Sequence, residues 1–284
     1  MMLRAPAKLN LCLYVGETRD DGLHELRSLF CPLTLADGIV VVDAEGEGDE
    51  VVCPGVDGPN LATLALEALR ARGWSRPPVY VEIDKRIPVA AGLGGGSADA
   101  AAILRLGLGE VDGLADLAAA IGADVPSQLD PGFALVAGAG ERVERLPDPG
   151  EPGFVLIPGD GGLATAEVYA AADGLGIGRP IRELDEIEGR LRAAASGGAS
   201  PLDYLDLLTN DLENPALSLQ PEISEALAAL EEVGAVKAMV TGSGPTAFGL
   251  FEDVVRADEA AAALAPRYAG AIVAAAQPRL GGDR

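Results

Sequence analysis

Four glycines fall within five residues in the stretch Lys85-Arg86-Ile87-Pro88-Val89-Ala90-Ala91-Gly92-Leu93-Gly94-Gly95-Gly96-Ser97-Ala98-Asp99-Ala100-Ala101-Ala102. The alternating residues 79–84 before the glycines predict a strand, and the alanine-rich run after them predicts a helix over 97–106. Glycine lets the backbone adopt positive φ and approach a ligand closely. The N–H groups and the partial positive charge at a helix start bind phosphate. The stretch therefore predicts a phosphate-binding loop over residues 92–97.

Two common nucleotide-binding loops do not fit this stretch. The chain has no Gly-Lys-Ser/Thr sequence, which a Walker A loop requires, and the glycines are too closely spaced for a dinucleotide-binding fingerprint. Ser97 can cap the following helix or place its hydroxyl on a phosphate or a metal. A tight strand-to-helix turn without any ligand is the alternative that the glycines alone leave open.

The composition excludes several classes of function. A formal net charge of −23 argues against a nucleic-acid partner, because phosphate backbones require a basic surface. No apolar run of about 18 residues is present, so we expect no membrane span. The first eight residues lack the apolar stretch of a secretory signal, which favours a cytoplasmic protein. Cys12, Cys31 and Cys53 are scattered and His24 is the only histidine, so we expect buried, reduced thiols rather than a zinc site.

The pattern along the chain predicts an α+β protein of two lobes, 1–150 and 151–284, joined near the Pro- and Gly-rich segment 147–153. The predicted strands of the first half are 7–15, 26–35, 39–43, 50–53 and 79–84, with a hairpin over 133–146. Its predicted helices are 60–72, 97–106 and 114–121. In the second half we predict strands over 154–157, 238–241, 247–251 and 271–275 and helices over 166–172, 182–195, 221–233 and 255–264, with one more helix after residue 200.

Three segments in order resemble the motifs of the GHMP (galactokinase–homoserine–mevalonate–phosphomevalonate) kinase superfamily. They are Pro6-Ala7-Lys8-Leu9-Asn10-Leu11, the stretch from Pro88 to Ala102, and Thr241-Gly242-Ser243-Gly244-Pro245-Thr246. The resemblance implies a two-lobed GHMP kinase fold, with an amino-terminal lobe similar to ribosomal S5 domain 2 and a ferredoxin-like carboxy-terminal lobe that completes the substrate site. It also implies ATP as the phosphate donor. The residues implied to bind ATP are Asn60, Pro88, Gly92, Leu93, Gly94, Gly95, Gly96, Ser97, Gly242, Ser243 and Gly244; for Asn60, a plain helix cap is the alternative.

Within the superfamily, four segments resemble the branch that phosphorylates 4-diphosphocytidyl-2-C-methyl-D-erythritol in the non-mevalonate isoprenoid pathway. They are residues 6–11, Asp21-Gly22-Leu23-His24-Glu25-Leu26, Gly122-Ala123-Asp124-Val125-Pro126 and Asn210-Asp211-Leu212-Glu213. The implied partner is this small cytidine-diphosphate-linked alcohol, and a monomer or homodimer is expected. Three alternatives stay open: a kinase for another alcohol such as homoserine, a decarboxylase on the same fold, and a non-catalytic ligand sensor.

The resemblance also implies roles for individual side chains. Asp124 is the expected general base for the acceptor hydroxyl, and Lys8 the expected partner that stabilises charge on the transferred group. A surface position is the alternative for each.

His24 is expected to hydrogen-bond the cytosine edge, where a surface position is again the alternative. Asn10, Thr165 and Tyr169 are similar to positions that touch the rest of the substrate or stack on the base.

Phosphoryl transfer needs charge neutralised on the β- and γ-phosphate oxygens, so Mg²⁺ is expected. Ser97 is the first candidate ligand and Asp99 the second. Two features depart from the branch, which usually carries an aromatic residue at the position of Leu23 and an aromatic pair where Ser127-Gln128-Leu129 stands here. We expect weaker substrate affinity from these changes rather than a different reaction.

Overall fold

The computed structural model describes residues 1–46, 48–56 and 60–279. Spatial proximity divides the chain into two compact units, each assembled from separate stretches of sequence. The first unit holds Met1–Ala7, Leu35–Val89 and Gly94–Pro131; the second holds Lys8–Thr34, Ala90–Leu93 and everything from Gly132 onward. Strands β1 (Met2–Thr18) and β2 (His24–Asp43) therefore each contribute residues to both units.

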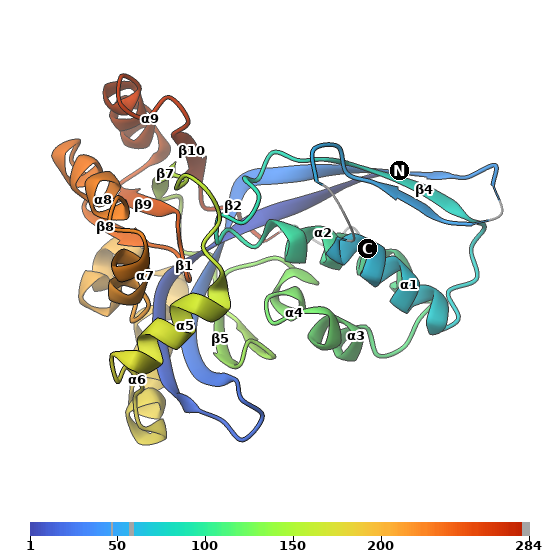
Figure 1. The fold of residues 1–284 in the computed structure, drawn as a ribbon, viewed down its shortest axis with the longest axis horizontal. Helices are drawn as coiled ribbons and strands as arrows, with labels where there is room; N and C mark the ends of the chain where they lie inside the picture. Colours follow the sequence, from blue (N-terminus) through green and yellow to red (C-terminus); the bar gives the residue numbers. More distant parts are fainter. Residues whose placement is uncertain (47, 57–59, 280–284) are drawn as a thin grey trace. The chain divides into compact units, whose positions relative to one another are not determined.

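The first unit packs helices onto part of a six-stranded sheet, in which β1 also pairs with β2. Residues 38–43 of β2 pair antiparallel with β4 (Val79–Asp84), which pairs parallel with β3 (Glu50–Val52). The helices are α1 (Leu61–Ala71), α2 (Gly95–Leu104), α3 (Leu114–Ile121) and α4 (Val125–Gln128), with a 3₁₀ turn at Arg105–Gly107. Figure 1 shows the four helices gathered on one side of β4. Every residue of α2 from Ala98 to Leu104 is buried, because its alanines let α1 and α4 approach closely.

The second unit contains two sets of strands. Residues 26–30 of β2 pair antiparallel with β5 (Ala134–Gly138), which forms a hairpin with β6 (Arg142–Arg145). A separate antiparallel sheet has the order β10-β7-β9-β8; its strands are β7 (Gly153–Ile157), β8 (Lys237–Val240), β9 (Ala247–Phe251) and β10 (Ile272–Ala275).

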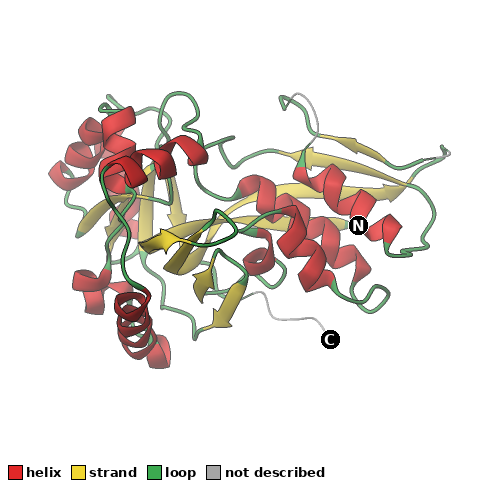
Figure 2. Cartoon of the chain, turned by 60° about the horizontal axis from the view of Figure 1, so that its bottom comes forward, coloured by secondary structure: helices red, strands yellow, loops and turns green. Residues whose placement is uncertain are grey.

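Five α-helices belong to the described part of the second unit. They are α5 (Thr165–Gly174), α6 (Ile181–Ala194), α7 (Glu213–Leu219), α8 (Ile223–Glu232) and α9 (Val254–Leu264), with 3₁₀ turns at Ser196–Gly198 and Pro201–Leu207. Helices α8 and α9 pack on the four-stranded sheet. Figure 2 shows both helices and strands in the chain, which confirms the α+β class.

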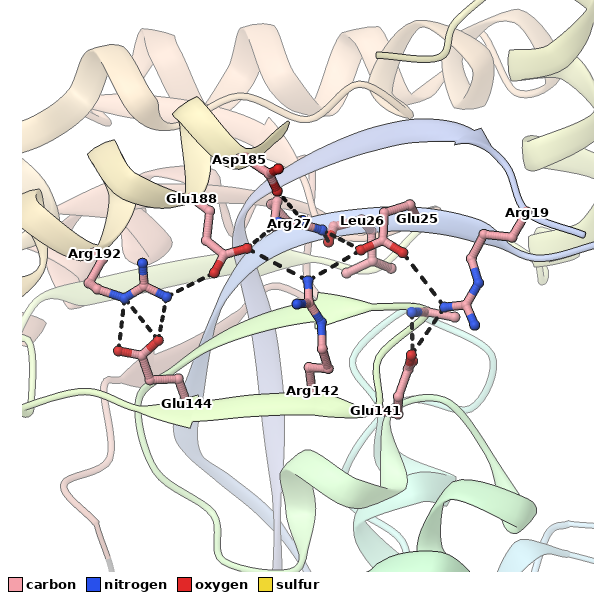
Figure 3. Close-up of polar contacts among 11 residues, drawn as sticks. Arg19, Glu25, Leu26, Arg27, Glu141, Arg142, Glu144, Asp185, Glu188 and Arg192 are labelled. Atoms are coloured by element: carbon pink, nitrogen blue, oxygen red, sulfur yellow. Dashed lines mark hydrogen bonds and ion pairs between the residues drawn. The ribbon is translucent and has the colours of Figure 1, made fainter. Parts of the chain in front are cut away.

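A network of ion pairs holds α6 against β2 and the β5–β6 hairpin (Figure 3). Its centre is Arg27, whose side chain is only 1% exposed and pairs with Glu25 at 2.6 Å, Asp185 at 3.0 Å and Glu188 at 2.5 Å. Arg142 bridges the same Glu25 and Glu188. Loss of Arg27 would leave Glu25 and Glu188 without their buried partner, so this arginine links β2 to α6.

Most predicted elements are confirmed within a few residues, but β2 was wrongly divided. The sequence predicts separate strands over 26–35 and 39–43, whereas the structure has one continuous strand. The apparent break lies at Asp37, which is fully buried and accepts backbone N–H groups of Arg86 at 2.6 Å and Ile87 at 2.8 Å. A buried aspartate with these partners is compatible with a strand interior.

Three further expectations changed or stay open. The helix predicted after residue 200 is the 3₁₀ turn Pro201–Leu207, and helices α4 and α7 were not predicted. Cys53 is only partly buried, while Cys12 and Cys31 are buried. The segment 147–153 joins β6 to β7 inside the second unit, so the division into lobes 1–150 and 151–284 stays a prediction. Across residues 1–46, 48–56 and 60–279, no helix combines the length and apolarity that crossing a membrane requires.

Candidate active site

The glycine-rich loop begins in the second unit, with Ala90–Leu93. Gly92 has φ +75°, and a Cβ at this position would lie 2.7 Å from the carbonyl oxygen of Gly244 and 3.1 Å from that of Thr241. Only glycine therefore fits here, for both conformational and steric reasons. The glycine-rich loop and the third of the three family motifs, Thr241–Thr246 (the third glycine-rich motif), therefore pack backbone against backbone at this point.

The loop continues in the first unit with Gly94, which has φ +70° and starts α2. No side chain caps this helix start, so its first-turn N–H groups are of the kind that bind phosphate. Ser97 lies inside the first turn, because the helix begins at Gly95. The possibility that Ser97 caps the helix is therefore wrong, while its hydroxyl role stays a prediction.

A buried charge cluster lies beneath this helix start. The amine of Lys85 contacts Asp37 Oδ2 at 2.5 Å and Asp99 Oδ2 at 2.8 Å. A Cβ on Gly95 would lie 3.2 Å from the same amine. Burial raises the pKa of Asp99 to about 7, since desolvation together with the charge of Asp37 outweighs the opposing effect of Lys85. The structure thus gives Asp99 a buried ion pair, and its role as a metal ligand stays a prediction.

Lys8 projects from β1 and is 5% exposed, so it is not a surface lysine. Its amine lies 2.6 Å from Asn10 Oδ1, 3.2 Å from the carbonyl oxygen of Gly92 and 5.0 Å from the ring centroid of Phe30. Asn10 is oriented in turn by its amide nitrogen, which donates to Ser28 Oγ at 2.9 Å. The ammonium group is held by fixed partners in an environment with little water, where a charge acts strongly on a neighbouring anion.

The third glycine-rich motif lies against the same two side chains. Thr241 Oγ1 accepts the backbone N–H of Asn10 at 2.9 Å. A Cβ on Gly242 would lie 3.1 Å from Asn10 Oδ1 and 3.6 Å from the amine of Lys8. The structure therefore brings together Lys8, Asn10, Gly92 and Gly242, which are far apart in sequence. The hydroxyl of Thr165 joins this group through Ser243 Oγ at 3.1 Å.

His24 and Tyr169 form a second pair of predicted substrate residues. Their rings lie 5.0 Å apart at an interplanar angle of 30°. The His24 side chain is 8% exposed, so a simple surface position is wrong. Its Nδ1 lies 3.0 Å from the carbonyl oxygen of Gly16 and its Nε2 3.4 Å from Asp173 Oδ1. The adjacent Leu23 is 54% exposed and leaves a small apolar surface beside the pair.

Asp124 belongs to the first unit, between α3 and α4. Its position after a helix end is confirmed, and Pro126 lies in the first turn of α4. Ser127 and Gln128, where an aromatic pair was the family expectation, are buried. Ser127 Oγ donates to the carbonyl oxygen of Asp124 at 2.7 Å, which fixes the backbone here. Lys8 belongs to the other unit, so a pairing of Lys8 with Asp124 stays a prediction.

Asn60 caps α1, since its Oδ1 accepts the N–H of Thr63 at 2.9 Å. This confirms the alternative reading of Asn60, and its contact with ATP stays a prediction. The sequence did not predict two features: the cluster of Lys85 with Asp37 and Asp99, and the hydrogen bonds between the backbone and the side chains of Asn210 and Glu213. The rarity of lysine in the chain could have drawn attention to Lys85. The family resemblance at residues 210–213, to which no role was assigned, could have drawn attention to Asn210.

Comparisons with known proteins match most of the chain. The family models "GHMP kinases N terminal domain" and "GHMP kinases C terminal" match residues 60–134 and 182–270. A curated relative from Streptomyces coelicolor, named 4-diphosphocytidyl-2-C-methyl-D-erythritol kinase, is 40% identical over 275 residues, which cover 92% of this chain and 91% of the relative. A relative of the same name from Anaeromyxobacter sp. (strain K) is 41% identical over 283 residues, covering 94% and 85%.

Solved structures agree. A crystal structure of 4-(cytidine 5'-diphospho)-2C-methyl-D-erythritol kinase aligns with a TM-score of 0.77 and 36% identity, covering 97% of this chain and 98% of that one. A mevalonate kinase aligns with a TM-score of 0.67 at 14% identity, covering 97% and 98%, which shows a shared fold alone.

Proposed function

The chain belongs to the GHMP kinase family, and on that premise we propose that it transfers the γ-phosphate of ATP to the 2-hydroxyl of 4-diphosphocytidyl-2-C-methyl-D-erythritol, a step of the non-mevalonate pathway to isoprenoid precursors. One observation carries the choice of acceptor: relatives with that kinase name are 40–41% identical over 92–94% of the chain. A GHMP kinase uses ATP as its donor. A cytoplasmic location and a monomeric or homodimeric state belong to the same proposal.

The transfer itself requires positioning and charge stabilisation more than covalent chemistry. We assign the first-turn N–H groups of α2 and the backbone of Gly242–Gly244 to the ATP phosphates. Lys8 stabilises the charge on the transferred group, and its fixed contacts with Asn10 and Gly92 mean that little reorganisation is needed during the reaction. The proton of the acceptor hydroxyl passes to the carboxylate of Asp124 as the oxygen attacks the γ-phosphorus, while the bond from that phosphorus to the β,γ-bridging oxygen breaks and ADP leaves.

The acceptor side is assigned to residues of the second unit. Tyr169 offers a ring face for the cytosine, and His24 holds that ring in place and presents its edge. Asn10 and Thr165 are assigned to the methylerythritol diphosphate. Leu23 provides apolar contact where an aromatic ring is usual, so we expect weaker affinity than in relatives with that ring.

Mg²⁺ would neutralise charge on the β- and γ-phosphate oxygens when bound with ATP. Among the described residues, no group of three or more His, Cys, Asp or Glu side chains could hold a metal ion by itself. A Mg²⁺ ion would therefore be held mostly by nucleotide phosphates and water, and the Ser97 hydroxyl is the assigned protein ligand.

The proposal is tested by ADP release from purified protein with Mg-ATP. The acceptors to compare are 4-diphosphocytidyl-2-C-methyl-D-erythritol, homoserine, mevalonate and galactose. Turnover with the cytidyl compound alone is the expected result. Turnover with another alcohol would keep the kinase and overturn the acceptor, whereas ATP binding without turnover on any acceptor would support a ligand sensor.

A further inference from the structure

The segment Asn210–Glu213 matches a family motif, yet none of the roles assigned above uses it. Its first residue, Asn210, is 8% exposed and lies just before α7. The amide nitrogen of Asn210 donates to two backbone carbonyls, those of Val240 and Gly242, both at 2.8 Å. These two carbonyls flank Thr241, where the third glycine-rich motif begins.

The orientation of this amide is determined by its partners. Two carbonyl oxygens can be satisfied only by the –NH₂ group, and the N–H of Leu212 donates to Asn210 Oδ1 at 2.9 Å. The Asn210 side chain therefore provides the donors for both carbonyls, those of Val240 and Gly242. An aspartate of the same shape would put a second acceptor oxygen against the two carbonyls.

The backbone of the same residue is fastened to β1. Asn210 forms a parallel bridge with Leu13, flanked by hydrogen bonds from Leu13 N–H to the carbonyl of Thr209 at 2.7 Å and from Asp211 N–H to the carbonyl of Leu13 at 2.8 Å. Strand β1 also carries Lys8 and Asn10. Asn210 thus connects the strand that bears the lysine to the loop that lies against it.

The part of the loop that Asn210 holds is the part next to Lys8. Gly242 has φ +58°, and a Cβ there would lie 3.6 Å from the Lys8 amine, so the backbone of Gly242 packs directly on the end of that side chain. A shift of this backbone would move the loop relative to the ammonium group. Two further hydrogen bonds reach residues 241–244, one from Asn10 N–H to Thr241 Oγ1 and one between the hydroxyls of Thr165 and Ser243.

We propose that Asn210 is a positioning residue for phosphoryl transfer, which fixes the loop Thr241–Gly244 in register with Lys8 on β1. This inference rests on the proposed kinase function. Because the loss is one of alignment at the transferred group, it falls mainly on kcat. Displacement of reacting groups by about 1 Å costs on the order of 100-fold in rate.

The test compares Asn210→Asp with wild type and with Tyr14→Phe. The Tyr14 hydroxyl donates to the carbonyl of Leu207 at 2.9 Å, and Tyr14 is 6% exposed, so the control also removes a buried side-chain bond to a carbonyl in the second unit. We expect Asn210→Asp to lower kcat by about 10- to 100-fold with the KM for the acceptor within about threefold. Tyr14→Phe should lower the melting temperature and leave both constants nearly unchanged. Asn210→Ser, which introduces no charge, serves if the aspartate variant does not fold.

A second readout does not depend on turnover. Amide hydrogen exchange at residues 242–244, measured without ligand, should be faster in the Asn210 variant than in wild type and in Tyr14→Phe. Faster exchange in a protein that phosphorylates no acceptor would show that Asn210 holds the loop, but it would overturn the proposed function and with it the role in phosphoryl transfer. An active wild type with unchanged kcat and unchanged exchange in the Asn210 variants would overturn the positioning role alone.

Discussion

The amine of Lys8 lies 2.6 Å from the side-chain oxygen of Asn10, two residues further along β1. A strand points residues i and i+2 to the same face, so the pair is preorganised by the backbone itself. We expect Lys8→Met to lower kcat by about 10²- to 10³-fold, because in the proposed function its charge acts where negative charge develops. Steady-state kinetics and a thermal melt check this, with Lys237→Met as the matched loss of a lysine. A Lys8→Met enzyme no more impaired than the Lys237 variant would exclude the assigned role.

Asp124 carries the second prediction. Asp124→Asn keeps the size of the side chain and removes its ability to take a proton. The rate should fall by about 10²- to 10⁴-fold while the Kd for ATP is retained. Asp116→Asn, the same change at an exposed position in the first turn of α3, is the control. Unaltered turnover by the Asp124 variant would rule out this general base.

The ring pair of His24 and Tyr169 predicts an effect confined to the acceptor. Stacking on one aromatic face is worth about 1–3 kcal/mol, so Tyr169→Leu should raise the KM for the cytidyl substrate by roughly 5- to 150-fold. The KM for ATP should stay unchanged. Tyr268→Leu, at a tyrosine outside the assigned site, is the comparison. A change in the KM for ATP instead would place Tyr169 on the nucleotide side.

The cluster of Lys85, Asp37 and Asp99 predicts a pH dependence of stability. The pKa of Asp99 is raised from 3.8 to about 7 in the folded protein, first by desolvation. Between these values the folded chain binds more protons at this position than the unfolded chain does, so the contribution to stability is present at low pH and is lost as pH rises through the window. Urea unfolding of wild type and Asp99→Asn should therefore show the variant gaining relative stability from about pH 4 to pH 7.

The same cluster supplies the control for that measurement. Lys85 acts to lower the pKa of Asp99, so Lys85→Met should move the window to higher pH. Partly buried Cys53 is the other titrating group that interacts with the cluster, and Cys53→Ala should leave the window of Asp99 near neutral pH. A relative stability of Asp99→Asn that falls over this range would contradict the prediction.

The local parts of the site could be predicted from sequence because their signals are local. The run from Gly92 to Ala102 combines residues that permit positive φ with residues that favour a buried helix, and the structure has that loop and helix. Helix α2 starts at Gly95, before the predicted Ser97, because Gly94 adopts φ +70° and begins the helix without a side-chain cap. The importance of Lys8 was implied by the family resemblance, whereas the alternation of β1 alone would place Lys8 on the face opposite Leu9 and Leu11.

The parts that failed depend on contacts between distant segments. Asp37 resembles a turn residue until the backbone N–H groups of Arg86 and Ile87 are placed beside it. Asn210 has no local pattern that reveals its acceptors, since these lie 30 and 32 residues away. Helices α4 and α7 are short and contain proline, so periodicity could not identify them.

Each compact unit is assembled from three stretches of the polypeptide, and this has a consequence for inheritance. No single crossover between two homologous genes can exchange one unit whole. A chimera joined at residue 150 would take Lys8 and Gly92 from one parent and Asn210 and Gly242 from the other, although these four belong to one unit. We therefore expect a chimera of two family members to fold well only when β1 of one parent fits the third glycine-rich motif of the other.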